Sequence, residues 1–179
     1  GDNRTVDFSN IGVNNGDGID DAKMRTGIFG AVNGSIVNVK FNNAISTITP
    51  ETLTDDCYHK KIGLLATELI GDLTNVSVTG DLTVNGNYQE DYVYYNTFIG
   101  GIVGYLTGNV TAVDSVVNVT NYLSSAIMGG VAGCVDGYNV NNKCNVSFAT
   151  NNGILISQPD EILDGNNGAA VSHGIYKGF

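Results

Sequence analysis

The sequence predicts an all-β protein, a parallel β-solenoid (β-helix-like) built from about four to five Gly-rich coils with insert loops of variable length. Three observations predict this fold: 24 Gly and only 2 Pro among 179 residues, short segments in which apolar and polar residues alternate, and one pattern that recurs along the chain. Gly and Asn favour tight turns, and alternation favours strands with one buried face. We expect residues 1–179 to form a single domain, whose segments 1–24 and 150–179 cap or edge the stack.

The recurring pattern starts with Gly, continues with two apolar residues and ends with Gly or Ala. Four copies begin at Gly27, Gly63, Gly101 and Gly130, so the lead glycines are 36, 38 and 29 residues apart. A fifth, degraded copy begins at Gly168. Gly inside a strand costs about 0.5–1 kcal/mol relative to Ala, so its recurrence at one position indicates a corner or a close backbone approach. We expect the chain to turn at each copy.

A second strand follows each copy and opens with another Gly. The first two of these segments, 34–41 and 71–78, align without a gap. The third begins at Gly108, and the fourth begins at Gly137 with about one residue inserted. One face of the second strands carries apolar residues: Val37, Val39, Phe41, Val76, Val78, Val117, Val119, Val146 and Phe148. Stacked coils can bury such faces against one another, whereas lone strands cannot.

Asparagine recurs at a corner within the second strand. Asn38, Asn75 and Asn142 occupy this corner in three copies, and Ala112 occupies it in the third copy. Asn tolerates the left-handed backbone region, and its amide can hydrogen-bond to an amide stacked above it. We therefore expect an asparagine ladder that Ala112 interrupts. The alternative fold is an antiparallel sandwich or barrel, but no hairpin turn recurs at the fixed offset that such a meander needs.

These residues resemble the GLUG motif, a glycine-rich repeat whose core runs like Gly-Gly-Leu-Val-Gly, then Gly-x-Ile-x-Asn, then a short strand ending in Thr-Gly-x-Val. Gly100–Gly104 and Leu73–Leu82 match it well, and copies one and four match it more loosely. The resemblance covers roughly residues 25–150. It implies a β-solenoid segment of a large bacterial surface or secreted protein, as in adhesins and the non-catalytic N-terminal regions of IgA-specific metalloproteases. No catalytic residue comes with the motif, and a likeness of fold does not establish function.

Four longer connections separate the repeated strands: 43–60, 86–97, 121–127 and 150–167. In solenoids such inserts usually project on one face and carry binding. The second insert is rich in tyrosines and acids that suit contact with a sugar or a protein. Its candidate ligand-binding residues are Tyr88, Glu90, Asp91, Tyr92, Tyr94 and Tyr95. The alternative is a β-hairpin extension whose alternate tyrosines pack on the solenoid wall.

A calcium loop is suggested near the N-terminus by oxygen-bearing residues at Asn15, Asp17, Asp20 and Asp21. Hard cations take several oxygen ligands that lie close in sequence. Val13 and Met24, however, stand where an EF-hand places its first carboxylate and its closing Glu. A solvated turn is therefore the favoured interpretation, and calcium is the only cofactor that the sequence suggests.

Paired acids raise the possibility of a carbohydrate-active β-helix enzyme of the polysaccharide lyase or glycoside hydrolase type. The pairs are Asp55 with Asp56, Glu90 with Asp91, and Asp160 with Glu161. No Lys or Arg recurs beside these pairs, and the two histidines, His59 and His173, have no nucleophile or ligand set near them in sequence. We therefore predict no catalytic residue.

The three cysteines are too few for a disulfide scaffold and lack zinc-site spacing. Cys134 and Cys144 could form a disulfide, because ten residues can carry the chain from one strand to the next. Two small buried side chains are the alternative. Cys57 is left over in either case.

Charge and hydropathy exclude two classes of partner. The formal net charge is -10, and no basic stripe exists that could bind nucleic acid. No apolar run approaches the length of about 20 residues that membrane insertion needs. The leading hypothesis is a non-enzymatic adhesion or spacer module of a larger multidomain protein, extracellular or on the cell surface. Its inserts would bind a host or matrix protein or a glycan, and a stalk without ligand is a further possibility.

Overall fold

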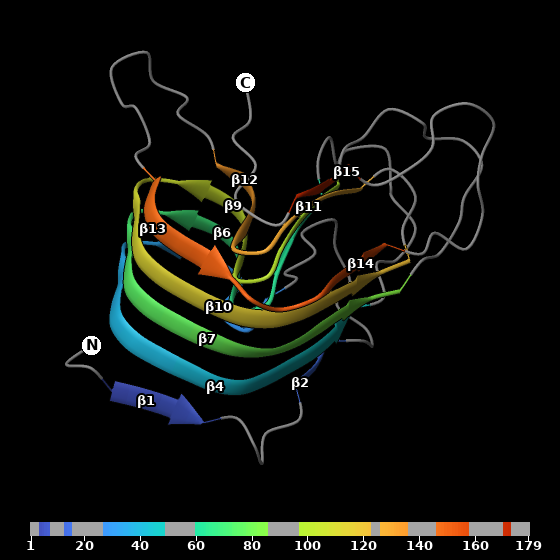
Figure 1. Cartoon of the computed structure of the whole chain (residues 1–179), viewed down its shortest axis with the longest axis horizontal. Coiled ribbons are helices and arrows are strands. Elements are labelled where there is room, and N and C mark those ends of the chain that lie inside the picture. Colours follow the sequence, from blue (N-terminus) through green and yellow to red (C-terminus); the bar gives the residue numbers. More distant parts are fainter. Residues whose placement is uncertain are drawn as a thin grey trace.

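The computed structural model confirms the predicted fold class: its strands form parallel sheets that stack as a β-solenoid (Figure 1). The structure describes residues 4–7, 13–15, 27–48, 60–85, 97–122, 126–135, 146–157 and 170–172. Within these ranges there is no helix, and every strand pair is parallel. The antiparallel alternative is therefore wrong.

Three sheets, here called A, B and C, run the length of the stack. Sheet A holds the long curved strands β4 (Ile36–Ile48), β7 (Leu73–Val84) and β10 (Val110–Asn121), with β1 (Arg4–Asp7) and β2 (Val13–Asn15) at one edge and β13 (Val146–Asn151) and β14 (Leu155–Ser157) at the other. Sheet B holds β5 (Lys60–Gly63), β8 (Thr97–Gly100), β11 (Ala126–Gly129) and β15 (Ala170–Ser172). Sheet C holds β3 (Ala31–Asn33), β6 (Ala66–Ile70), β9 (Val103–Thr107) and β12 (Ala132–Val135).

Each coil passes through sheets B, C and A in that order. We number the coils by their sheet A strands, so that coil 1 contains β4, coil 2 contains β7, coil 3 contains β10 and coil 4 contains β13 and β14. In Figure 1 the sheet A strands form a broad arc, and sheets B and C lie across its concave side. β15 pairs with β11 and so begins a fifth coil.

The strand register shows a repeat of 37 residues through the first half of sheet A in coils 1 to 3, as in the column Val39, Val76 and Val113. The register of β4 against β7 shifts between Phe41 and Ala44, so the rest of β4 pairs with residues 36 positions later. The second copy of the predicted pattern was misaligned by one residue. Gly63 pairs with Gly100 rather than with Gly101, which places Leu64 at the position of Gly101. The fifth copy also differs, because Ala170–Ser172 pair with the strand that precedes the coil 4 corner, Ile127–Gly129, and not with the corner itself.

The predicted corner within sheet A is a left-handed backbone position. Asn38, Asn75 and Ala112 have φ values of 54°, 51° and 54°. The left-handed residue breaks the simple alternation of faces, so Ile36 and Val39 pack against the core. The prediction that Val37 shares the buried face with Val39 is wrong.

The prediction that Asn142 occupies this corner in coil 4 is also wrong. Because Val110 pairs with Val146 and Val113 with Ala149, the counterpart of Ala112 is Phe148, and the connection 136–145 is far longer than predicted.

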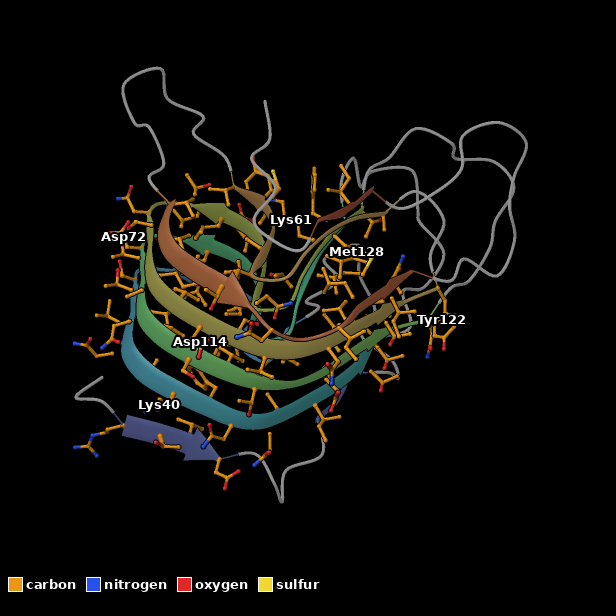
Figure 2. All side chains as sticks on the ribbon, viewed as in Figure 1. Lys40, Lys61, Asp72, Asp114, Tyr122 and Met128 are labelled. Carbon is orange, nitrogen blue, oxygen red and sulfur yellow. The ribbon has the colours of Figure 1, made fainter. Side chains whose placement is uncertain are left out.

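The corner between sheets B and C touches the middle of sheet A. A Cβ on Gly101 would lie 3.4 Å from Val117 Cβ, and Ser115 Oγ donates a hydrogen bond to Gly130 O at 3.1 Å. The buried apolar residues of all three sheets form one core cluster. Met128, labelled in Figure 2, belongs to this cluster and is fully buried.

Candidate functional site

Side chains on the outer face of sheet A bridge consecutive coils, and we call these bridges the outer rungs. Asn75 Nδ2 donates to Asn38 Oδ1 at 2.8 Å, which confirms the first step of the predicted asparagine ladder. The other rungs pair an Asp with an amide or hydroxyl of the next coil: Asn43 with Asp7 (3.1 Å), Asn109 with Asp72 (3.0 Å), Asn118 with Asp81 (2.8 Å) and Thr150 with Asp114 (2.9 Å). Figure 2 labels Asp72, which directly precedes β7, and Asp114, which lies on β10.

The rungs have a fixed direction. In each side-chain pair the acceptor lies on the earlier coil and the donor on the later one. Two backbone groups follow the same direction, because Asn109 N donates to Asp72 Oδ1 and Ile154 N donates to Asn118 Oδ1. Asn43 N donates in the opposite direction, to Thr79 Oγ1 of the next coil. The hydrogen bonds to the Asp carboxylates are charge-assisted, and such bonds are stronger than neutral ones. The outer carboxylates therefore hold the coils in register.

A second cluster lies where sheets B and C turn their outer faces toward each other. Lys61 Nζ lies 3.0 Å from Glu68 Oε1 and 4.4 Å from the centroid of the Tyr105 ring. Phe98 and Tyr105 have ring centroids 5.9 Å apart. Strand register stacks these residues in two columns, one from each sheet. The ion pair, the cation–π contact and the aromatic pair link coils 2 and 3 outside the main core.

Four connections join a described strand of sheet A to a described strand of sheet B, and they leave and enter the stack at one corner, which we call the insert corner. The exit positions Ile48, Val84, Asn121 and Ser157 lie in adjacent strands of sheet A. The entry strands β5, β8, β11 and β15 are likewise neighbours in sheet B. Adjacent strands are about 4.8 Å apart, so the stems of successive inserts are separated by that spacing.

The connections at the insert corner are acidic. Segments 49–59, 86–96, 123–125 and 158–169 contain eight Asp and Glu residues and no Lys or Arg. They also contain five of the nine tyrosines. The predicted inserts began too early in three places, because 43–48 belong to β4, Asn121 to β10, and much of 150–157 to β13 and β14.

Comparison with known proteins gives no match to a protein family, to a curated protein or to a solved structure.

The predicted ligand-binding residues, Tyr88 to Tyr95, lie outside the described residues, and so do the acid pairs and both histidines. The calcium candidates Asp17, Asp20 and Asp21 lie outside them too, and Asn15 is the last residue of β2. Within the described ranges no group of three or more His, Cys, Asp or Glu side chains is placed to hold a metal ion. Ligand binding by the tyrosine insert therefore stays a prediction, and so does calcium binding near the N-terminus.

Cys134 is buried, with 3% of its surface exposed, on β12 in register with Tyr105. Cys144 and Cys57 lie outside the described part of the chain. The Cys134–Cys144 disulfide therefore stays a prediction.

Sequence reasoning missed most of the outer rungs and the Lys61–Glu68–Tyr105 cluster. The signal was present, because Asp72 and Asn109, Asp81 and Asn118, and Glu68 and Tyr105 are all separated by the 37-residue repeat. A search for polar pairs at that separation would have found them. Among the described residues no helix is long and apolar enough to span a bilayer.

Proposed function

We propose that this chain is a non-enzymatic module of an extracellular or cell-surface protein, in which a rigid solenoid presents the insert corner to a host or matrix protein or a glycan. We also propose that its repeat is of the GLUG type, because Gly100–Gly104 and Leu73–Leu82 resemble that motif. It needs no cofactor.

The convergence of the four connections on one corner is the observation that carries this proposal. Three of the longer connections, 49–59, 86–96 and 158–169, share this corner, whereas the connection 136–145 joins sheet C to sheet A. Because the flanking strands stack, the inserts of neighbouring coils start and end next to one another along the axis, and repeat proteins commonly bind through the face that carries their insertions. Acidic and tyrosine-rich inserts suit sugar hydroxyls and basic protein surfaces.

The use of the described carboxylates also supports a structural module. Asp7, Asp72, Asp81 and Asp114 each accept a hydrogen bond from the next coil, and Glu68 pairs with Lys61. A glycoside hydrolase needs two carboxyl groups facing one bond, and these five are instead engaged with amides, a hydroxyl and an ammonium. No described residue favours the carbohydrate-active enzyme over the module.

The test is to exchange the tyrosine insert for a connector that the chain itself uses. Coil 3 passes from sheet A to sheet B through 123–125, so 86–96 can be replaced by Leu-Ser-Ser with the flanking strands unchanged. We expect binding on glycan arrays and to matrix proteins to be lost while the thermal unfolding midpoint stays near that of the parent chain.

The same exchange at 49–59 is the matched control, because it shortens a neighbouring insert that lacks the run of tyrosines. The proposal predicts that this control keeps at least part of the binding. It is contradicted if the parent chain binds none of the arrayed glycans or matrix proteins, or if the 86–96 exchange leaves binding unchanged. Hydrolysis or eliminative cleavage of a polysaccharide by the parent chain would favour the enzyme instead.

A further inference from the structure

The two outermost strands of sheet A offer edges that match each other. Among the described strands β1 lies at one end of the main path and β13 at the other, and each has a pairing partner on one side only. Every interface inside the sheet is a parallel pairing of the same residue columns. A second copy of this chain could therefore continue the stack, with its β13 pairing to β1 as β4 pairs to β7.

Arg4, the first residue of β1, lies in a column of sheet A residues that face the core. Its register partner is Val39, and the column continues through Val76 and Val113, both nearly fully buried, to Ala149. Two residues along, Val6 pairs with Phe41 in the next core-facing column and is 38% exposed. The edge strand thus combines an exposed apolar residue that suits stacking with a charged residue where every other coil has an apolar one.

A docked β13 would bring no acid to pair with Arg4. In continued register the second copy would place Ala149 against Arg4 and Asn151 against Val6. Covering a guanidinium with a further coil removes it from water, and without a partner charge this is strongly unfavourable. Charged residues in core-facing positions of edge strands are a known protection against edge-to-edge pairing.

We infer that Arg4 is the residue that keeps the β1 edge from pairing with β13 of a second copy of the chain. The β1 edge suits that copy, because the strand direction and column order would be those of the coil-to-coil pairings inside the molecule. The charge of Arg4 blocks its use. This role is independent of any ligand at the insert corner.

The experiment is to measure the molecular mass of the full chain against concentration, by light scattering after size exclusion. We expect Arg4→Val to assemble at a concentration at least about tenfold lower than the wild-type chain, since Val restores the apolar column. Arg4→Lys keeps the charge and should behave as wild type. Thr5→Val adds an apolar residue at the neighbouring column, which pairs with exposed Lys40, and should also behave as wild type.

Two further variants keep the result decisive. Arg4→Thr removes the charge without adding a large apolar group, and it should assemble more readily than Arg4→Lys even if Arg4→Val fails to fold. Val6→Lys added to Arg4→Val returns a charge to the same edge and should restore the wild-type mass. The inference is overturned if Arg4→Val and Arg4→Thr stay as monomeric as wild type, if Thr5→Val assembles equally, or if the double variant still assembles.

Discussion

At the residue scale, the left-handed position in sheet A shows how side-chain chemistry selects a backbone conformation. Asn38 and Asn75 occupy this position with a hydrogen bond between their side chains. The sequence allowed this prediction because Asn recurs at the repeat distance and tolerates positive φ. The same conformation at Ala112 has no such help, since its methyl group cannot bond to Asn75. A left-handed backbone costs a residue such as Ala about 1–2 kcal/mol.

Replacing Ala112 by Asn should therefore stabilise the protein. Asn relieves part of the backbone cost, and its amide can donate to Asn75 as Asn75 donates to Asn38. We expect Ala112→Asn to raise the free energy of unfolding by about 1 kcal/mol, measured by urea denaturation. Asn75→Ala is the matched opposite change and should lower it by about 1–2 kcal/mol. Equal stability of the parent chain and both variants would contradict this account of the corner.

Two buried serines in sheet A should respond oppositely to the same substitution. Ser46 is 1% exposed, and its Oγ is the one buried side-chain oxygen or nitrogen without a hydrogen-bond partner in the described structure. Ser115 is fully buried and donates to Gly130 O. We expect Ser46→Ala to be neutral or to stabilise by up to about 1 kcal/mol, and Ser115→Ala to destabilise by about 1 kcal/mol. Thermal unfolding checks both, and a larger loss at Ser46 than at Ser115 would contradict the hydrogen bonding seen here.

At the element scale, the corner between sheets B and C explains why one copy was misaligned. The sequence pattern was aligned on its first glycine, but two adjacent corner positions can require glycine. One is that of Gly63 and Gly100, whose backbone lies against the following strand, and the other is that of Gly101. Coil 2 has Leu64 at the second position, and the register places Gly80 in the column of Val117. Coil 2 thus combines a large residue at the second corner position with a glycine in sheet A. The sequence alone does not reveal that these two residues belong together.

Gly100→Ala should disrupt this corner. An added Cβ would overlap Val103 O and lie 2.7 Å from Gly133 N, both backbone atoms that cannot move alone. We expect a loss of about 3 kcal/mol or more in the free energy of unfolding. Gly34→Ala is the comparison, since a Cβ there meets nothing within 4 Å and only the backbone at φ +141° opposes it. Its loss should be smaller, about 1–3 kcal/mol. Chemical denaturation of both variants tests this, and an equal or smaller loss at Gly100 would contradict the close packing.

At the scale of the whole molecule, the repeat predicted the solenoid but not the placement of its insertions. Stacking follows from amphipathic strands at a fixed distance, which are visible in Val39, Val76 and Val113. The longer connection 136–145 was missed because Gly137 imitates the glycine that opens the second strand in other copies. The prediction that residues of the tyrosine insert bind a ligand rests on composition alone, since no repeat constrains them. The outer rungs were missed because Asp, Asn and Thr substitute for one another there.

The central claim is a parallel stack in which the residue columns in the first half of sheet A repeat every 37 residues from coil 1 to coil 3. Nuclear Overhauser contacts across strands in the isotopically labelled chain test it most directly. We predict contacts from Val39 to Val76 and from Val76 to Val113, followed by Val113 to Ala149, which is 36 positions later in the sequence. Contacts that instead join strands close in sequence in antiparallel pairs, or that place Val76 opposite residues other than Val39 and Val113, would contradict the solenoid.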